Sequence, residues 1–216
     1  MRAIGKKPAS NSPHLCSTCF TFISKNHGGA EIPLSMLFAD VRGSTAMAEK
    51  MSPGEYQRLM GRFYDAAAKA VFANDGFLDK FVGDEVIALF APLLAGEQHA
   101  TRAVDAARAL LAGTGHGSAE GPWLQIGAGV HTGVAWMGAI GEGQHSTMTA
   151  LGDPMNVAAR LASLAKPGEI LLTIPAADAA GVDVAALPHQ QLELKGKEQL
   201  TEVVSLLGSE ASAIPA

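Results

Sequence analysis

The segment FLDKFVGDEVIALF, residues 77–90, constrains the fold of this chain more than any other stretch. Two short runs of β-forming residues meet at Gly83 and Asp84, which is typical of a tight hairpin turn. An amphipathic helix is predicted immediately before the hairpin, because Ser52 and Glu55 match a capping box and apolar residues then recur at helical spacing. A helix with one apolar stripe next to a hairpin indicates a sheet on which the helix packs.

The flanking segments extend this pattern. A buried strand is predicted at residues 34–40, a second helix at 97–113 and another strand at 124–133. The order strand, helix, hairpin, helix, strand is βαββαβ, so we predict an α+β fold with a ferredoxin-like core and helices packed on one face of the sheet. A third helix is predicted at residues 153–165, and further strands at residues 145–152, 168–173, 190–196 and 201–207.

The length and composition suit one domain. A chain of 216 residues, of which 48% are hydrophobic and 17% charged, can bury a substantial core. A polar segment rich in Pro and Gly changes to an apolar one at about residue 33. We therefore predict a polar head at residues 1–33, a single domain at 34–207 and a disordered tail at 208–216.

The charge and hydropathy of the chain exclude some classes of partner. A net charge of −5 at pH 7, without a basic run, argues against a nucleic-acid-binding protein. No apolar window is long enough to span a bilayer, and the first residues lack the apolar centre of a secretory signal. We expect a cytoplasmic protein without a membrane span.

The head contains four residues of types that bind metal. His14, Cys16, Cys19 and His27 could provide one tetrahedral zinc site, while the Cys-x-x-Cys spacing is also found in redox motifs. Because there is no second cysteine pair, an unliganded head is favoured, and zinc binding and redox sensitivity stay open as alternatives.

Two acidic residues mark a candidate metal and phosphate site. Asp40 ends a predicted strand and is followed by Gly43, Ser44 and Thr45, whose backbone amides are expected to be free for phosphate oxygens. The hairpin carries Asp84 to the same edge of the sheet, so that both carboxylates could share divalent cations such as Mg²⁺. The alternative is that each aspartate only caps a turn.

Four motifs, FADVRGST, KFVGDE, GVHTG and LGDPMNVAARL, occur in an order and spacing that resemble the catalytic domain of class III nucleotidyl cyclases, mostly adenylyl cyclases. The resemblance extends from about residue 34 to 206. It implies conversion of ATP to 3′,5′-cyclic AMP and pyrophosphate, with two divalent cations, Mg²⁺ or Mn²⁺, held by Asp40 and Asp84.

The resemblance also implies which residues contact the base. Lys80 corresponds to the residue that reads adenine, and its ammonium can donate to a ring nitrogen of adenine, whereas guanine presents an N1–H group there. Thr149 replaces the aspartate that most members of the family carry at its position. Threonine resembles the subgroup that includes bicarbonate-responsive cyclases, which makes bicarbonate stimulation a hypothesis.

In the third helix, Asn156 and Arg160 are four residues apart and share one face. By resemblance, Asn156 orients the ribose and Arg160 neutralises charge on the triphosphate as pyrophosphate leaves. Either Lys195 or Lys197 is expected to contact the triphosphate, and the sequence does not choose between them.

The resemblance implies a homodimer with shared active sites. In this family the aspartate pair and the base-reading lysine are expected from one subunit, and the asparagine and arginine from the other. The alternative is a catalytically silent homologue that binds nucleotide and dimerises. The presence of Asp40, Asp84, Lys80, Asn156 and Arg160 together favours the enzyme.

Overall fold

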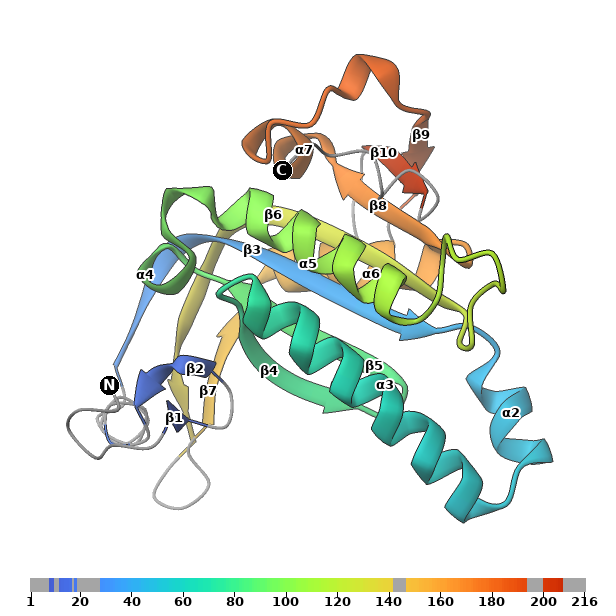
Figure 1. Cartoon of the computed structure of the whole chain (residues 1–216). Coiled ribbons are helices and arrows are strands. Elements are labelled where there is room, and N and C mark those ends of the chain that lie inside the picture. The colour runs from blue at the N-terminus through green and yellow to red at the C-terminus, as the bar shows by residue number, and fades with distance from the viewer. Residues whose placement is uncertain are drawn as a thin grey trace.

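The computed structural model describes residues 8–9, 12–16, 18, 28–141, 147–193 and 200–207. The main sheet has the strand order β4-β5-β3-β6-β8-β10-β9, and β7 also pairs with β6 (Figure 1). Its strands are β3 (Gly29–Val41), β4 (Phe77–Val82), β5 (Glu85–Phe90), β6 (Ile126–Ile140), β7 (Thr147–Leu151), β8 (Glu169–Thr173), β9 (His189–Leu192) and β10 (Thr201–Leu207). The helices are α2 (Ser44–Lys50), α3 (Pro53–Ala73), α4 (Pro92–Ala95), α5 (His99–Gly113), α6 (Asp153–Leu164) and α7 (Ile174–Ala179). A short separate pair, β1 (Pro8–Ala9) and β2 (Ser12–Cys16), precedes them.

The first part of the domain confirms the predicted βαββαβ order. The elements β3, α3, β4, β5, α5 and β6 follow one another, and the four strands lie in the order β4-β5-β3-β6 with every neighbouring pair antiparallel. Strand β8 then pairs with β6 in parallel, so the whole sheet is mixed. These features give the α+β fold expected from the sequence.

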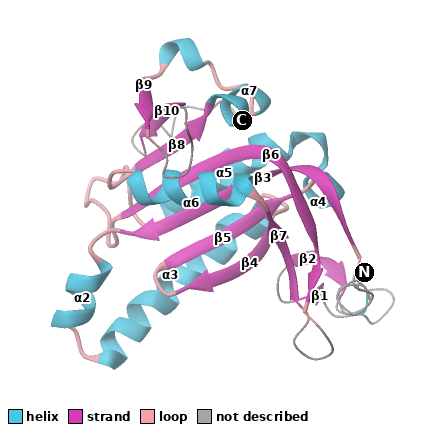
Figure 2. Ribbon diagram, turned by 180° about the vertical axis from the view of Figure 1, so that it is seen from behind, coloured by secondary structure: helices cyan, strands magenta, loops and turns pink. Residues whose placement is uncertain are grey.

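Helices cover both faces of the sheet, which corrects the expectation of one covered face. Helices α3 and α5 pack on one face over Leu37 and Ala39 of β3. Helix α6 packs on the opposite face with Met36 and Phe38; Figures 1 and 2 view the sheet from these two sides. Successive residues of β3 point to opposite faces, and the four residues named here are all apolar. Both faces of the strand must therefore be shielded from water by a helix.

Two glycines allow α6 to approach β6 very closely. A Cβ atom at Gly129 would collide with the backbone nitrogen of Ala162, and one at Gly127 would collide with the carbonyl oxygen of Ala165. The helix therefore lies directly on the backbone of the strand.

The hairpin and the helix before it match the sequence prediction. Ser52 caps α3 and forms a complete capping box with Glu55. Gly83, with φ of 61°, adopts the left-handed conformation at the turn between β4 and β5. The backbone N–H of Val41 donates to the carbonyl oxygen of Asp84 at 3.1 Å, which fixes the hairpin tip to the end of β3.

A strand, β3, runs across the predicted domain boundary at residue 33. Strand β3 begins at Gly29, before the boundary expected at residue 33, and Gly29 pairs with Gly138 of β6. Cys19 and His27 lie outside the described residues, as does the predicted tail at 208–216, so the zinc, redox and tail predictions stay untested. In the part of the chain that the structure describes, no helix combines the length and apolarity needed to cross a membrane.

Candidate active site

The structure brings Asp40 and Asp84 together at one edge of the sheet. Asp40 lies near the end of β3, and the hairpin tip carrying Asp84 is bound to the next residue, Val41. Partial burial raises the pKa of Asp40, and the neighbouring Asp84 carboxyl raises it further, although Arg42 acts in the opposite direction. Two crowded carboxylates of this kind fit a divalent cation, which takes oxygen ligands and would relieve their repulsion.

Glu85 is a third acidic residue at this edge that the sequence analysis missed. It lies directly opposite Asp40 in the pairing of β3 with β5. Burial raises its pKa to about 7, with additional contributions from the charges of Asp40 and Asp84. Within the described ranges, no group of three or more His, Cys, Asp or Glu residues is arranged to hold a metal ion, so the candidate metal site is the aspartate pair.

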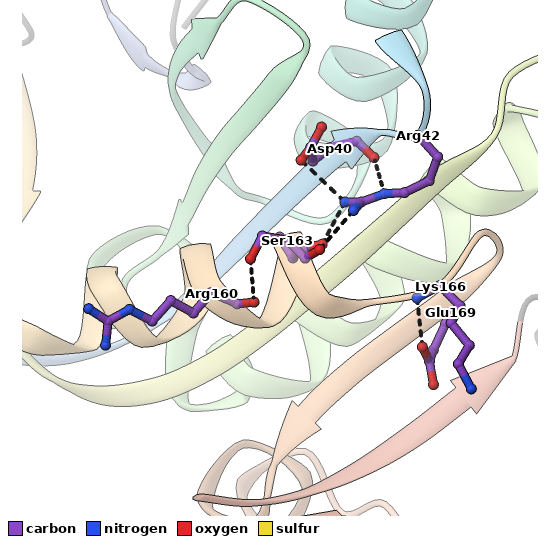
Figure 3. Close-up of polar contacts among 7 residues, drawn as sticks. Asp40, Arg42, Arg160, Ser163, Lys166 and Glu169 are labelled. Carbon is purple, nitrogen blue, oxygen red and sulfur yellow. Dashed lines mark hydrogen bonds and ion pairs between the residues drawn. The ribbon is translucent and has the colours of Figure 1, made fainter. Parts of the chain in front are cut away.

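Arg42 links this edge to the end of α6. Its Nη2 atom lies 3.3 Å from Oδ2 of Asp40, and the guanidinium donates to the carbonyl oxygens of Ala162 at 2.6 Å and Ser163 at 2.9 Å (Figure 3). The last carbonyls of a helix lack partners within the helix, and a cation satisfies them well. Arg42 could not be assigned this role from the sequence, because only the fold places the end of α6 beside it.

The predicted phosphate-contacting residues follow this strand end. Gly43, with φ of 72°, precedes α2, and Ser44 and Thr45 are the first residues of that helix. Their contact with phosphate stays a prediction.

The two predicted base-contacting residues meet each other. Nζ of Lys80, on β4, lies 3.4 Å from Oγ1 of Thr149, on β7. A residue that the sequence analysis missed, Asp79, joins them: its Oδ2 atom lies 3.3 Å from Nζ of Lys80 and accepts a hydrogen bond from Thr149 at 3.0 Å. Burial raises the pKa of Asp79, while the Lys80 ammonium lowers it.

Asn156 and Arg160 lie on α6, as predicted, but Arg160 is not directed at the aspartate pair. Asn156 is exposed, Arg160 is half-buried, and the Arg160 side chain extends along the helix away from Asp40 (Figure 3). Lys195 and Lys197 lie outside the described residues. Among the described residues of one chain, therefore, Arg160 is not brought to the aspartate pair.

This arrangement of sheet, hairpin and α6 matches a known family. The family model for the adenylate and guanylate cyclase catalytic domain matches residues 30–206. The chain belongs to this family. The adenylate cyclase of Anabaena cylindrica is 33% identical to this cyclase domain over 144 residues, which are 62% of this chain and 27% of that protein.

Solved structures of cyclases share the fold of this cyclase domain. The guanylyl cyclase Cya2 matches with a TM-score of 0.74 and 25% identity, over 82% of this chain and 93% of that one. The adenylyl cyclase CyaB from P. aeruginosa matches with a TM-score of 0.71 and 23% identity, over 82% and 95% of the two chains. Because one neighbour is a guanylyl cyclase and the other an adenylyl cyclase, the shared fold does not choose the nucleotide. The chain spans about a third or less of the length of the curated relatives that it matches.

Proposed function

We propose that this cyclase domain is an adenylyl cyclase, which converts ATP to 3′,5′-cyclic AMP and pyrophosphate. The observation that carries the proposal is the meeting of Asp40 and Asp84 at the end of β3, in a chain that belongs to the cyclase family. The contact between Lys80 and Thr149 supports ATP as the substrate, since the lysine ammonium can donate to a ring nitrogen of adenine.

In this mechanism Asp40 and Asp84 would hold two divalent cations, Mg²⁺ or Mn²⁺. Bound there, the cations would supply Lewis-acid activation of the ribose 3′-hydroxyl and neutralisation of the triphosphate. Asn156 orients the ribose, so that its 3′-oxygen faces the α-phosphorus. The 3′-oxygen gives its proton to a water molecule and bonds to the α-phosphorus, while the bond from that phosphorus to pyrophosphate breaks. Arg160 donates hydrogen bonds to the negative charge that develops as pyrophosphate leaves.

The direction of Arg160 supports a site shared between two copies of the chain. Because its guanidinium extends away from Asp40, a nucleotide at the aspartate pair would receive Asn156 and Arg160 from a second copy. The family resemblance groups Lys80 with the aspartates. The contact of Lys80 with Thr149 argues instead that Lys80 acts in the same site as Asn156 and Arg160 of its own chain. Thr149 lies on β7, the strand that leads directly into α6.

A turnover assay tests the proposal. Purified protein is incubated with ATP or, separately, GTP in Mg²⁺ or Mn²⁺, and cyclic nucleotide is followed beside an Asp40→Ala control. We expect cyclic AMP from the wild type and none from the control. If ATP binds but neither nucleotide is cyclised with any metal, the chain is the silent nucleotide-binding homologue instead.

A further inference from the structure

Asp79 is a buried acidic residue for which the proposed mechanism has no role. Its side chain is 1% exposed, whereas the Lys80 side chain beside it is 44% exposed. Its Oδ1 atom is buried and has no hydrogen-bond partner among the residues that the structure describes. A buried carboxylate with one oxygen unsatisfied costs stability, so filling space in β4 does not explain an aspartate at this position.

A β-bulge directs Asp79 towards the base-contacting pair. Leu78 pairs with Ala88 and Lys80 pairs with Ile87, so that Asp79 is the extra residue of β4. In a regular strand, Asp79 and Lys80 would point to opposite faces of the sheet. The bulge removes this alternation, and both side chains reach the hydroxyl of Thr149.

These contacts determine which hydrogen bonds the pair has left to offer. Thr149 donates its single hydroxyl proton to Asp79 and accepts from Lys80, so only an acceptor lone pair is unused. Lys80 has three N–H groups and directs one to Asp79 and one to Thr149, so one donor is unused. Without the Asp79 carboxylate, the hydroxyl could rotate and donate elsewhere.

We propose that Asp79 is a positioning residue. By accepting the Thr149 hydroxyl proton, it leaves Lys80 as the hydrogen-bond donor to the base and Thr149 as the acceptor, so that the pair selects adenine over guanine. One donor beside one acceptor matches N1 and the 6-amino group of adenine. In the same pose guanine presents N1–H to the donor and O6 to the acceptor, so both contacts fail. The inference rests on the proposed function in assuming that the base lies at this pair.

The test measures base preference by binding, which does not depend on turnover. Dissociation constants for 3′-deoxy-ATP and 3′-deoxy-GTP, which lack the attacking hydroxyl, are measured on the full chain with Mg²⁺. The variants are Asp79→Ala, Thr149→Val, the double variant and Thr149→Ser, with Asp178→Ala on the exposed face of α7 as a matched control.

We expect Asp79→Ala and Thr149→Val each to reduce the preference for the adenine nucleotide by about tenfold, the usual effect of losing one hydrogen bond at a buried polar site. The double variant should lose no more than either single variant, because the two residues act as one unit. Thr149→Ser should recover most of the preference lost in Thr149→Val, and Asp178→Ala should match the wild type.

Two results would overturn the inference. The first is an unchanged preference in Asp79→Ala, even with a lower melting temperature, because Asp79 would then only stabilise the strand. The second is a wild type that binds both nucleotides equally. Failure of the proposed function is a separate result, namely that the wild type forms no cyclic nucleotide, and base preference is measurable in either case.

Discussion

The guanidinium of Arg42 contacts the side chain of Asp40 at 3.3 Å and the last turn of α6 through the carbonyl oxygens of Ala162 and Ser163. One side chain thus connects the candidate metal site with the helix that carries Asn156 and Arg160. In the proposed shared sites, this contact would connect the aspartate half of one site with the α6 half of the other.

Replacing Arg42 should weaken the attachment of α6. In Arg42→Ala the two carbonyl oxygens lose charged donors, each worth about 1.5–3 kcal/mol at most, so we expect a clearly lower melting temperature. Arg58→Ala is the control, because Arg58 is exposed on α3. Equal melting temperatures for the two variants in thermal unfolding would contradict the anchoring role.

Cation binding should depend on both aspartates. We expect Asp40→Ala and Asp84→Ala each to weaken Mn²⁺ binding by at least about tenfold, because each removes one of two carboxylates from a site of few ligands. Titration of the full chain with Mn²⁺, followed by electron paramagnetic resonance, measures the affinity. Asp178→Ala should bind like the wild type, and unaltered binding in the Asp40 and Asp84 variants would place the cations elsewhere.

Mixing inactive variants should reveal shared sites and assign Lys80. Asp40→Ala and Arg160→Ala subunits, after exchange, should recover activity, because one site of each mixed dimer would be intact. If Lys80 acts with α6, Lys80→Ala should complement Asp40→Ala and fail to complement Arg160→Ala. The opposite pattern would show that Lys80 acts in the same site as the aspartates of its own chain. No recovery in any mixture despite subunit exchange would count against shared sites.

The stability of the fold should decrease at acidic pH partly through His116. Its Nε2 atom accepts a hydrogen bond from the backbone N–H of Ile126 at 3.2 Å, and burial lowers the pKa of the ring. The unfolded chain therefore binds the proton more readily, so this contribution is present above a pH of about 6.5 and is lost as the pH falls below it. His116→Gln, whose amide oxygen can accept the same hydrogen bond, should show a flatter melting temperature between pH 7 and pH 5. An unchanged slope would exclude His116 as a source of the pH dependence.

Local patterns in the sequence predicted the parts of the fold that depend on neighbouring residues. The capping box at Ser52 and the turn at Gly83 follow from short-range chemistry, and both are present. The meeting of Asp40 with Asp84 was also predictable, because a hairpin beside a strand brings its tip to the end of that strand. For Lys80 and Thr149, the family resemblance supplied the prediction that local patterns lack.

Other features depend on packing that no local pattern contains. Helix α6 has an apolar stripe that fits either face of the sheet, so its position required knowledge of how β6 exposes Gly127 and Gly129. The bulge at Asp79 shifts the register by one residue, and nothing in its immediate sequence distinguishes it from a regular strand. The contacts of Arg42 could not be predicted for the same reason, since its partners on α6 are distant in sequence.

The close approach of α6 to the glycines of β6 has a mechanical consequence. Helices that touch a sheet through long side chains can slide by changing rotamers, whereas backbone against backbone leaves no such freedom. We therefore expect Asn156 and Arg160, on α6, to move together with β6. In a dimer that shares its sites as proposed, admission of nucleotide would then require one subunit to move against the other, and ligands that alter turnover would act on the contact between the subunits.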